Sequence, residues 1–249
     1  MAVLRKVKAA FRGAVSLVLF ALYGLGALAI SPIMLALRNP RLCQPVVRGV
    51  WTPLLWLFEV TRLIKVERGN LGPMDGTIIV ANHPSLIDVV IISVIVPKTL
   101  YVAKHALLKN PFMSAIVRNT SLPDDERLTE AAAPYLAEGW NVLVFPEGTR
   151  SPCPGELRDF HRGAAQLALR TGAKVVCVGV GMTRRILGKN QPPWDMGSDR
   201  VVYSFQADEP VRFEADKSRG LRPQAAELTE TLHKRVKNLI CDKKACDRA

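Results

Sequence analysis

The sequence contains few aromatic residues and few residues that bind metals. Aromatic side chains make up 6% of the 249 residues and are not interleaved with basic ones. This argues against nucleic acid as the partner, as does the lack of a nucleic-acid-binding motif. The four histidines and five cysteines do not have the spacing of a metal site. We therefore expect no metal, and reduced thiols in a protein that faces the cytosol.

Acidic residues are also scarce relative to basic ones. The 34 Lys and Arg residues outnumber the 22 Asp and Glu residues, so the formal net charge is +12. A basic surplus predicts an anionic partner, such as phospholipid headgroups or a phosphorylated substrate. Hydrophobic residues make up 49% of the chain, so it can bury a sizeable core and still expose apolar surface.

The beginning of the chain is a candidate membrane segment. Residues 1–12 carry four basic residues and no acidic one, and Gly13–Leu37 carries no charge over a length that can cross a bilayer. A signal peptide, a single span and two helices that dip into one leaflet are the alternatives. The glycines and the Ser-Pro pair within 24–32, followed by a second apolar stretch at 46–57, favour a break and therefore the pair of helices. The single span and the pair of helices both predict membrane association.

The polar segment Asn82–Asp88 lies between two of the most apolar runs of the sequence. A buried strand that ends at a polar turn and leads into a helix produces this pattern. Asp88 would then lie in the first helical turn, with His83 at the strand end pointing back toward it. An imidazole beside a carboxylate is an oriented general base. The alternative is a capped turn, in which Asp88 accepts bonds from backbone N–H groups and His83 is structural.

A second polar segment, Pro146–Arg150, follows the continuous apolar strand Asn141–Phe145. Gly148 lets the backbone approach a ligand closely, and Thr149 and Arg150 offer donors suited to a phosphate. The alternative for this segment is an ordinary strand-end turn with a surface salt bridge.

Lys104 follows a third apolar segment, Leu100–Ala103. A solvated side chain is the default interpretation of a lysine at a strand end, and a cation directed at a phosphate is the functional alternative.

Apolar strands alternate with helical patterns through most of the chain, which predicts an α/β fold. The sheet should be mixed and mainly parallel, with helices covering both faces. Ligands of such sheets bind beyond the carboxyl ends of the strands, so both polar segments are expected at one sheet edge. We expect strands at about 62–67, 77–81, 100–103, 141–145, 174–180 and 201–207, and helices after 88, at 110–118, 128–137 and 160–170, and from 223.

Three regions follow from this pattern: a membrane-associated helical segment at 1–58, an α/β domain at 59–215, and an amphipathic helix with a basic tail at 216–249. The basic residues of the last region are either solvated or rest on anionic lipid: Lys234, Arg235, Lys237, Lys243 and Lys244.

The pairing of Asn82-His83-x4-Asp88 with Phe145–Arg150, about sixty residues apart, resembles the glycerophospholipid acyltransferase family, and within it the bacterial 1-acyl-glycerol-3-phosphate acyltransferases. The resemblance covers roughly residues 60–210. Supporting matches are Tyr101–Lys104, Asn110–Phe112, Phe160-x2-Gly163 and Glu209–Val211.

The resemblance implies the transfer of an acyl chain from a thioester to a lipid hydroxyl, with His83 as the base and Asp88 as its orienting partner. The acceptor's glycerophosphate would be held by Glu147, Gly148, Thr149 and Arg150, with Lys104 as a further cation. Acyl-CoA or acyl carrier protein would be a co-substrate, with no cofactor, no metal and no covalent acyl-enzyme. Lysophosphatidic acid is the implied acceptor and phosphatidic acid the product, at the cytoplasmic face of a bacterial inner membrane.

The sequence departs from the family pattern in two places. The family has an apolar-glycine stretch ending in an arginine between the two motifs, whereas the chain has an acidic stretch that ends in Arg127. Arg127 takes the place of that arginine in our prediction, as a substrate-binding residue. A later strand of the family contains a proline near the position of Cys177. Both regions concern the acceptor and the acyl chain, so another lysolipid is the alternative acceptor.

Two further functional hypotheses belong to other classes. A non-catalytic membrane adaptor would use the N-terminal segment and the basic tail, but its polar motifs would be expected to have decayed. A lipid hydrolase would use His83 to activate water in place of an alcohol.

Overall fold

The computed structural model describes residues 2–109 and 114–241. Within these residues eight strands form one sheet, in the order β1-β7-β6-β2-β5-β3-β4, and β8 pairs with β6 beyond this path. The strands are β1 (Ile64–Glu67), β2 (Thr77–Ala81), β3 (Thr99–Ala103), β4 (Ser121–Pro123), β5 (Asn141–Val144), β6 (Lys174–Met182), β7 (Val201–Ala207) and β8 (Val211–Arg212).

The predicted mixed, mainly parallel sheet is confirmed. Strands β6, β2, β5, β3 and β4 pair in parallel, so their carboxyl ends lie at one edge. Strand β7 pairs antiparallel with β6 and parallel with β1, so these two strands run the opposite way. The end of β6 therefore meets the start of β7, with Met182 opposite Tyr203.

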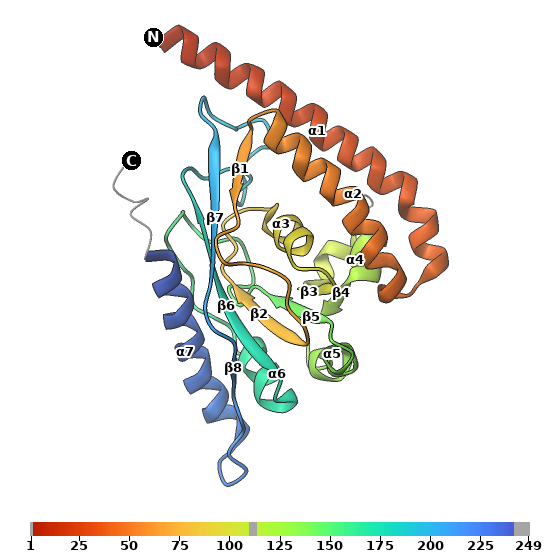
Figure 1. Ribbon diagram of the computed structural model, residues 1–249, viewed down its shortest axis with the longest axis vertical. Helices are drawn as coiled ribbons and strands as arrows, with labels where there is room; N and C mark the ends of the chain where they lie inside the picture. The colour runs from red at the N-terminus through yellow and green to blue at the C-terminus, as the bar shows by residue number, and fades with distance from the viewer. Residues whose placement is uncertain (1, 110–113, 242–249) are drawn as a thin grey trace.

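Helices cover both faces of the sheet, as the apolar strands predict (Figure 1). Helices α1, α2, α3 and α4 lie on one face, and α5, α6 and α7 lie on the other. The helices are α1 (Ala2–Leu37), α2 (Pro40–Val60), α3 (Asp88–Ile95), the 3-10 helix η1 (His105–Lys109), α4 (Ser114–Thr120), α5 (Leu128–Ala137), α6 (Gly163–Thr171) and α7 (Leu221–Cys241).

The strand alternation divides the hydrophobic core in two. In β2, Ile79 and Ala81 pack with the α1–α4 side, whereas Ile78 and Val80 pack with the α5–α7 side. All five residues of β2 are buried. A strand buried on both faces accounts for the continuous apolar runs of the sequence.

The N-terminal region is a pair of helices, but the predicted position of the break is wrong. Helix α1 continues through Pro32, and the chain turns at Arg38 and Asn39 instead. Arg38 adopts a left-handed conformation (φ 43°), and the Asn39 side chain accepts a bond from the N–H of Arg41 as the N-cap of α2. Prolines within both helices are tolerated, so proline was a poor marker of the helix end here.

Helix α1 is the one helix among the described residues that is long and apolar enough to cross a membrane, by length and composition. It is nevertheless packed on the rest of the fold near its start. The buried guanidinium of Arg12 donates to the carbonyl oxygens of Arg62 and Asp199 at 2.7 Å, Gly197 at 2.9 Å and Leu63 at 3.0 Å. These four bonds, called the Arg12 clamp below, hold α1 to the two segments that lead into β1 and β7, at one end of this parallel pair.

The same stretch of α1 contacts the loop that precedes β7. The Ser16 hydroxyl donates to the carbonyl oxygen of Pro193 at 2.7 Å. Gly13 passes so close to this loop that a Cβ atom would lie 2.6 Å from the Trp194 carbonyl oxygen. The contacts of Arg12, Gly13 and Ser16 show that this part of α1 is an integral element of the fold.

We expect Arg12→Met to lower the apparent Tm by about 5–10 °C, because four carbonyl oxygens, two of them in buried hydrogen bonds, lose a charged donor at a cost of about 3 kcal/mol. Thermal unfolding of the purified protein in detergent measures this effect. Lys6→Met, at an exposed position of the same helix, is the matched control and should stay within about 1 °C of the wild type. An Arg12 variant as stable as the control would contradict the clamp.

The C-terminal helix packs as predicted, with Leu228, Leu232 and Val236 buried on one face. Its basic face is partly used within the protein, because Arg235 pairs with Asp208 at 2.7 Å and donates to the Glu209 carbonyl. Lys243 and Lys244, like the predicted helix start at Asn110–Phe112, lie outside the described residues.

Candidate active site

The residues of both polar motifs meet at the edge formed by the carboxyl ends of the parallel strands. The first motif follows β2 and the second follows β5, and these strands pair with Val80 opposite Val144. The two loops are joined directly, since the N–H of Ser151 donates to the carbonyl oxygen of His83 at 2.7 Å. The prediction that both motifs lie at one sheet edge is confirmed.

His83 and Asp88 form the predicted pair. Nδ1 of His83 lies 3.1 Å from Oδ2 of Asp88, which occupies the first turn of α3. The imidazole stacks on the Phe145 ring at 4.2 Å between centroids, and its side chain is 17% exposed. With Nδ1–H donated to the carboxylate, Nε2 carries the lone pair. A base with this orientation can take a proton from a substrate at the open side of the ring.

Asp88 is fully buried, and its carboxylate also accepts the N–H of Ser85 at 2.7 Å. Its other oxygen, Oδ1, has no hydrogen-bond partner among the described residues. Burial raises the pKa of Asp88, while the bonds from His83 and Ser85 oppose the rise. Asp88 therefore contacts the histidine as the first interpretation predicts, and it also accepts a backbone N–H in the turn as the alternative predicts.

Glu147 connects the two motif loops. One of its oxygens accepts the N–H of His83 at 3.0 Å and the hydroxyl of Ser151 at 2.6 Å, and the other accepts the N–H of Arg158 at 3.0 Å. The side chain is buried. The structure thus places Glu147 differently from the predicted contact with an acceptor, because both oxygens are bound within the protein.

Gly148 lies beside the side chains of Lys104 and His161. It adopts a left-handed conformation (φ 61°), and a Cβ atom there would lie 3.0 Å from the His161 ring and 3.4 Å from Nζ of Lys104. Lys104 comes from the end of β3, and the N–H of His161 donates to the carbonyl oxygen of Pro146 at 2.8 Å. A side chain at position 148 would fill the space between them, so the glycine keeps this surface open. Below, Lys104, Gly148 and His161 are called the Gly148 cradle.

His161 was not predicted as a site residue. In the sequence it appears only as one of the two unspecified positions of Phe160-x2-Gly163. Nothing in its local pattern indicates that the loop before α6 folds back onto Gly148, so only the tertiary structure reveals the contact.

Arg150 and Thr149 complete the second motif. Nη1 of Arg150 donates to the carbonyl oxygens of Leu187 at 2.8 Å and Gly188 at 2.9 Å. Burial lowers the pKa of Arg150, which nevertheless keeps its charge. Leu187 also accepts the N–H of Leu86 from the first motif. Arg150 therefore fixes the loop after β6 against both motifs, and Thr149 lies half-buried in the same turn.

Arg127 lies at the same sheet edge but further out. It follows the edge strand β4, is 75% exposed, and pairs with Asp125 at 2.7 Å. The acidic residue that makes this stretch atypical of the family is thus the partner of the arginine, and a contact of Arg127 with substrate stays a prediction.

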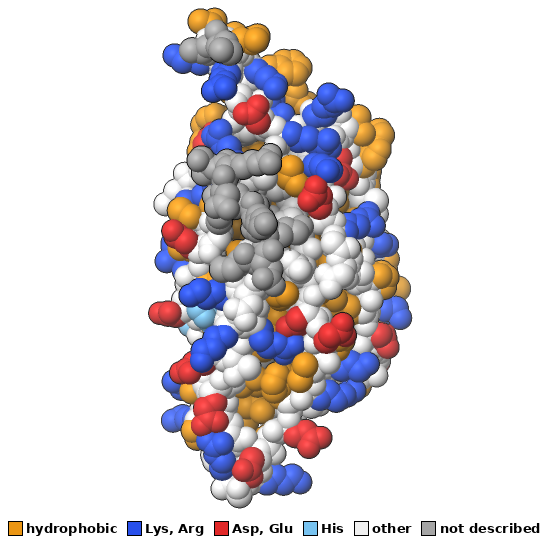
Figure 2. Space-filling view, turned by 60° about the vertical axis from the view of Figure 1, so that its left-hand side comes forward, with side chains coloured by type: hydrophobic (Ala, Val, Ile, Leu, Met, Phe, Trp, Pro, Cys, Tyr) orange, Lys and Arg blue, Asp and Glu red, His pale blue; other side chains and the backbone are white. Residues whose placement is uncertain are grey.

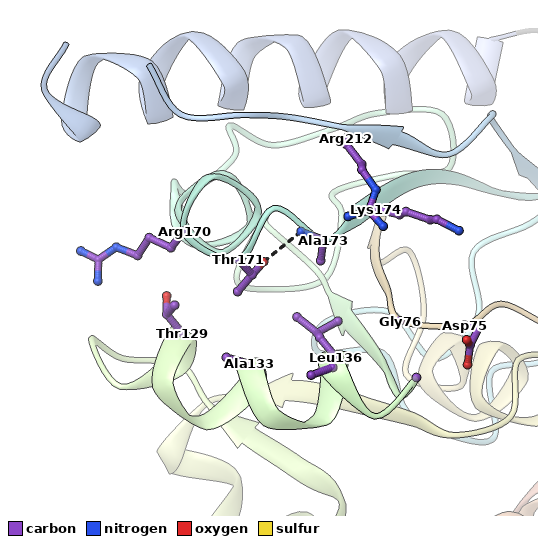
Figure 3. A pocket seen from close by; sticks show the side chains of 12 residues that line it. Asp75, Gly76, Thr129, Ala133, Leu136, Arg170, Thr171, Ala173, Lys174 and Arg212 are labelled. Carbon is purple, nitrogen blue, oxygen red and sulfur yellow. Dashed lines mark hydrogen bonds between the residues drawn. The ribbon is translucent and has the colours of Figure 1, made fainter. Parts of the chain in front are cut away.

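A groove of about 560 Å³ opens at the opposite edge of the sheet, where Lys174 and Arg212 lie near the start of β6 (Figure 3). Its side chains do not converge on one point, because Arg170 points away from the groove. Arg212 donates to the carbonyl oxygen of Gly172. Ligands of parallel sheets bind at the other edge, so this groove is not the candidate active site.

The fold and the site define the class: an α/β protein with a carboxylate-oriented histidine at the ligand-binding edge of its sheet, in the same site as the side chains of Lys104 and His161. A family model described as Acyltransferase matches residues 63–181, which include both motifs and the strands that carry them. Residues 63–181 therefore match this acyltransferase family, and the resemblance predicted from the two motifs is confirmed.

Several known proteins resemble the chain. It is 28% identical over 145 residues to a 1-acyl-sn-glycerol-3-phosphate acyltransferase of Borreliella burgdorferi, covering 55% of the chain and 57% of that protein. It is 30% identical over 125 residues to a protein of the same name from Neisseria gonorrhoeae, covering 46% and 48%. A lyso-ornithine lipid O-acyltransferase of Pseudomonas aeruginosa is 27% identical over 157 residues, covering 59% of each chain.

The chain spans about half the length of the curated relatives that it matches. The fold has a longer match in the crystal structure of the 1-acyl-sn-glycerophosphate acyltransferase PlsC of Thermotoga maritima. The match covers 95% of this chain and 96% of the PlsC chain, with a TM-score of 0.63 and 24% identity. At this identity the likeness shows the fold.

Proposed function

We propose that the protein transfers an acyl chain from a thioester, acyl-CoA or acyl carrier protein, to the free hydroxyl of lysophosphatidic acid, giving phosphatidic acid. The observation that carries the proposal is the His83–Asp88 pair at 3.1 Å, placed at the same sheet edge as the Gly148 cradle. The pair supplies a base for a hydroxyl, and the cradle supplies positive charge for a phosphate.

The reaction follows from the orientation of the imidazole. Nε2 of His83 takes the proton of the acceptor hydroxyl as its oxygen attacks the thioester carbonyl carbon. The resulting oxyanion collapses, the carbon–sulfur bond breaks, and the imidazolium returns its proton to the leaving thiolate. Asp88 stabilises the imidazolium between these steps through the Nδ1 bond.

The Gly148 cradle is proposed as the site of the acceptor's phosphate. Lys104 and His161 lie on either side of a glycine whose missing side chain leaves the surface accessible. The amino group of Lys104 is a point charge suited to a phosphate oxygen, and the imidazole is a further N–H donor. Arg150 acts behind them by holding the loop after β6.

Membrane attachment is proposed for the helix pair α1/α2, lying on one leaflet rather than spanning the bilayer. The outer surface of α1 exposes large hydrophobic side chains, among them Val3, Val7, Phe11, Val18, Leu22 and Leu25. Figure 2 shows hydrophobic side chains next to Lys and Arg side chains at the end of the molecule where α1 begins. Because the Arg12 clamp binds α1 to the α/β domain, the helix cannot leave it to cross a membrane alone.

The active-site edge lies close to this membrane-facing side. Leu86 of the first motif and Trp194 of the loop before β7 are exposed hydrophobic residues, and Trp194 borders Gly13 of α1. A lipid acceptor could then reach His83 without leaving the bilayer surface. The proposed location is the cytoplasmic face of a bacterial inner membrane, where the anionic lipids attract the basic protein.

The acceptor is tested with a panel of lipids and a single thioester donor. We expect the purified protein to acylate lysophosphatidic acid at least about 100-fold faster, in kcat/KM, than lyso-ornithine lipid, because the latter has no phosphate for the cradle. Product lipids are identified by mass spectrometry and the free thiol is measured separately. The reverse preference would assign the protein the acceptor of its Pseudomonas relative.

Lys104→Met tests the cradle in the same assay. The loss of one phosphate cation should raise KM for lysophosphatidic acid about tenfold and leave KM for the thioester unchanged. Lys98→Met, at an exposed lysine in the turn before β3, is the matched control. Equal KM values for the two variants would remove Lys104 from the acceptor site.

The two other functional classes give distinct results. A membrane adaptor would release no thiol from any acyl donor, and a hydrolase would release thiol and free fatty acid without a new lipid product. The choice between acyl-CoA and acyl carrier protein is decided by supplying each donor alone.

A further inference from the structure

A buried tyrosine outside both motifs is hydrogen-bonded to the catalytic turn. The hydroxyl of Tyr203, on β7, donates to the hydroxyl of Ser85 at 2.8 Å. The N–H of Ser85 donates in turn to Oδ2 of Asp88 at 2.7 Å, and this oxygen is the one that faces Nδ1 of His83. Four residues are thus connected from the middle of the sheet to the proposed base.

The residues behind His83 have no freedom to rearrange. Tyr203, Ser85 and Asp88 are all fully buried. Tyr203 is paired on both sides, with Val66 of β1 and with Met182 of β6. Its ring is one of the largest fully buried side chains of the protein. A hydroxyl held by a strand that is paired on both sides therefore fixes the position of Ser85, whereas Ser85 itself lies in a turn.

We propose that Tyr203 is a positioning residue for the acyl transfer, which acts through Ser85 to hold Asp88 and thereby His83 in the reactive orientation. The inference rests on the proposed function, because it concerns the efficiency of that reaction. Tyr203 does not touch the substrate. Its hydroxyl holds Ser85 so that the Ser85 N–H reaches Asp88, and Asp88 then accepts two bonds on the oxygen that binds the histidine.

The direction of the tyrosine bond supports this role. Burial and the nearby charge of Asp88 raise the pKa of Tyr203 well above its ordinary value, so the hydroxyl keeps its proton at every working pH. Tyr203 is therefore a permanent donor. Any buried tyrosine needs a hydrogen-bond partner, so the test must separate positioning from simple satisfaction of the hydroxyl.

Tyr203→Phe removes the hydroxyl and retains the ring. We expect kcat to fall about tenfold, with KM for lysophosphatidic acid and for the thioester unchanged, because the loss affects orientation of the base and not binding. Ser85→Ala should have a similar effect. The double variant should be no slower than the slower single variant, because both substitutions break the same connection.

Tyr101→Phe is the matched control. Tyr101 is also a buried strand tyrosine, and its hydroxyl is hydrogen-bonded to a side-chain hydroxyl, that of Thr120 at 3.1 Å. It is not connected to Asp88 by the hydrogen bonds of the described residues. Thermal unfolding of both variants separates a loss of fold from a loss of rate, and kcat of the control should match the wild type.

The pH dependence of kcat provides a readout that a structural role would not move. Asp88 is surrounded by His83, Glu147, Arg150 and Tyr203, and of these only the tyrosine is changed. Loosening the Ser85 N–H bond removes a contact that favours the carboxylate, so the pKa of Asp88 rises further. The pH at which kcat falls on the acidic side should therefore change in Tyr203→Phe and stay in place in Tyr101→Phe.

The outcomes distinguish this inference from the proposed function. No acyl transfer by the wild type on any acceptor would refute the proposed function itself. An active wild type with a folded Tyr203→Phe variant of unchanged kcat and pH profile would refute only the positioning role. Additive losses in the double variant, or equal losses in Tyr203→Phe and Tyr101→Phe, would also overturn it.

Discussion

His83→Ala is expected to lower kcat/KM for acyl transfer by about 10³-fold, the largest loss of activity from any single side chain outside Asp88. The substitution removes the group whose Nε2 faces away from Asp88 and is free to accept the hydroxyl proton. Binding should persist, because the Gly148 cradle and the apolar surfaces are unchanged. Product lipid and released thiol, measured together over substrate concentrations below and above KM, report the loss.

The fold should survive this change. The His83 side chain is partly exposed and contacts the face of Phe145, so its removal leaves an open surface and no closed cavity. His233→Ala is a suitable control, because His233 likewise packs against a phenylalanine, Phe160, at 4.8 Å between ring centroids. A His83 variant that keeps more than a tenth of wild-type activity would exclude the histidine as the base.

Asp88→Asn is expected to change activity and stability in opposite directions. Activity should fall about 10³-fold, because an amide cannot stabilise the imidazolium and can hold the ring in the other tautomer. Stability should rise by about 1 kcal/mol, because a fully buried carboxylate with one unpaired oxygen is replaced by a neutral group. Activity assays and thermal unfolding of the same preparation measure both effects.

The direction of the Asp88 pKa shift predicts how the stability gain of Asp88→Asn depends on pH. The pKa of Asp88 is raised in the folded protein, so ionisation of this group destabilises the fold at pH values above its unfolded pKa of about 3.9. The penalty grows as the pH rises through the folded pKa and is absent below the unfolded one. The Tm advantage of Asp88→Asn should therefore be larger at neutral pH than at acidic pH and disappear toward pH 4.

The exposed variant Asp199→Asn serves as the control for this experiment, since its side chain is 85% exposed and contacts Lys8 at 3.8 Å and the hydroxyl of the neighbouring Ser198 at 2.8 Å. It should alter neither activity nor Tm. An Asp88→Asn protein that is both inactive and less stable at neutral pH would show that the carboxylate also holds the turn together by its charge.

The sheet and the position of the site could be predicted from the sequence because both depend on local patterns. Continuous apolar segments such as Thr77–Ala81 and Asn141–Val144 indicate strands buried on both faces, and parallel strands bring the residues that follow them to one edge. His83 and Asp88 are close in the sequence, so their contact required only a turn and the first residues of a helix.

The residues that were misplaced or missed depend on contacts between distant segments. Glu147 has the chemistry of a ligand-binding acid, but its partners come from Arg158 and from a loop 64 residues earlier. His161 reaches Gly148 only because the chain after the second motif folds back. The predicted helix break near Pro32 was wrong for another reason. An apolar helix such as α1 tolerates a proline without a turn of the chain.

The position of Glu147 limits how this fold can diverge. Its carboxylate joins the two motif loops, so neither loop can change its backbone path without displacing the other. Replacement of one loop by that of a relative would break the hydrogen bonds of Glu147. The two loops must therefore be inherited together as one unit. Proteins of this fold can then come to accept new lipids mainly through substitutions at the edge of the site, at positions such as Lys104 and His161. Replacement of these side chains leaves the paired loops intact.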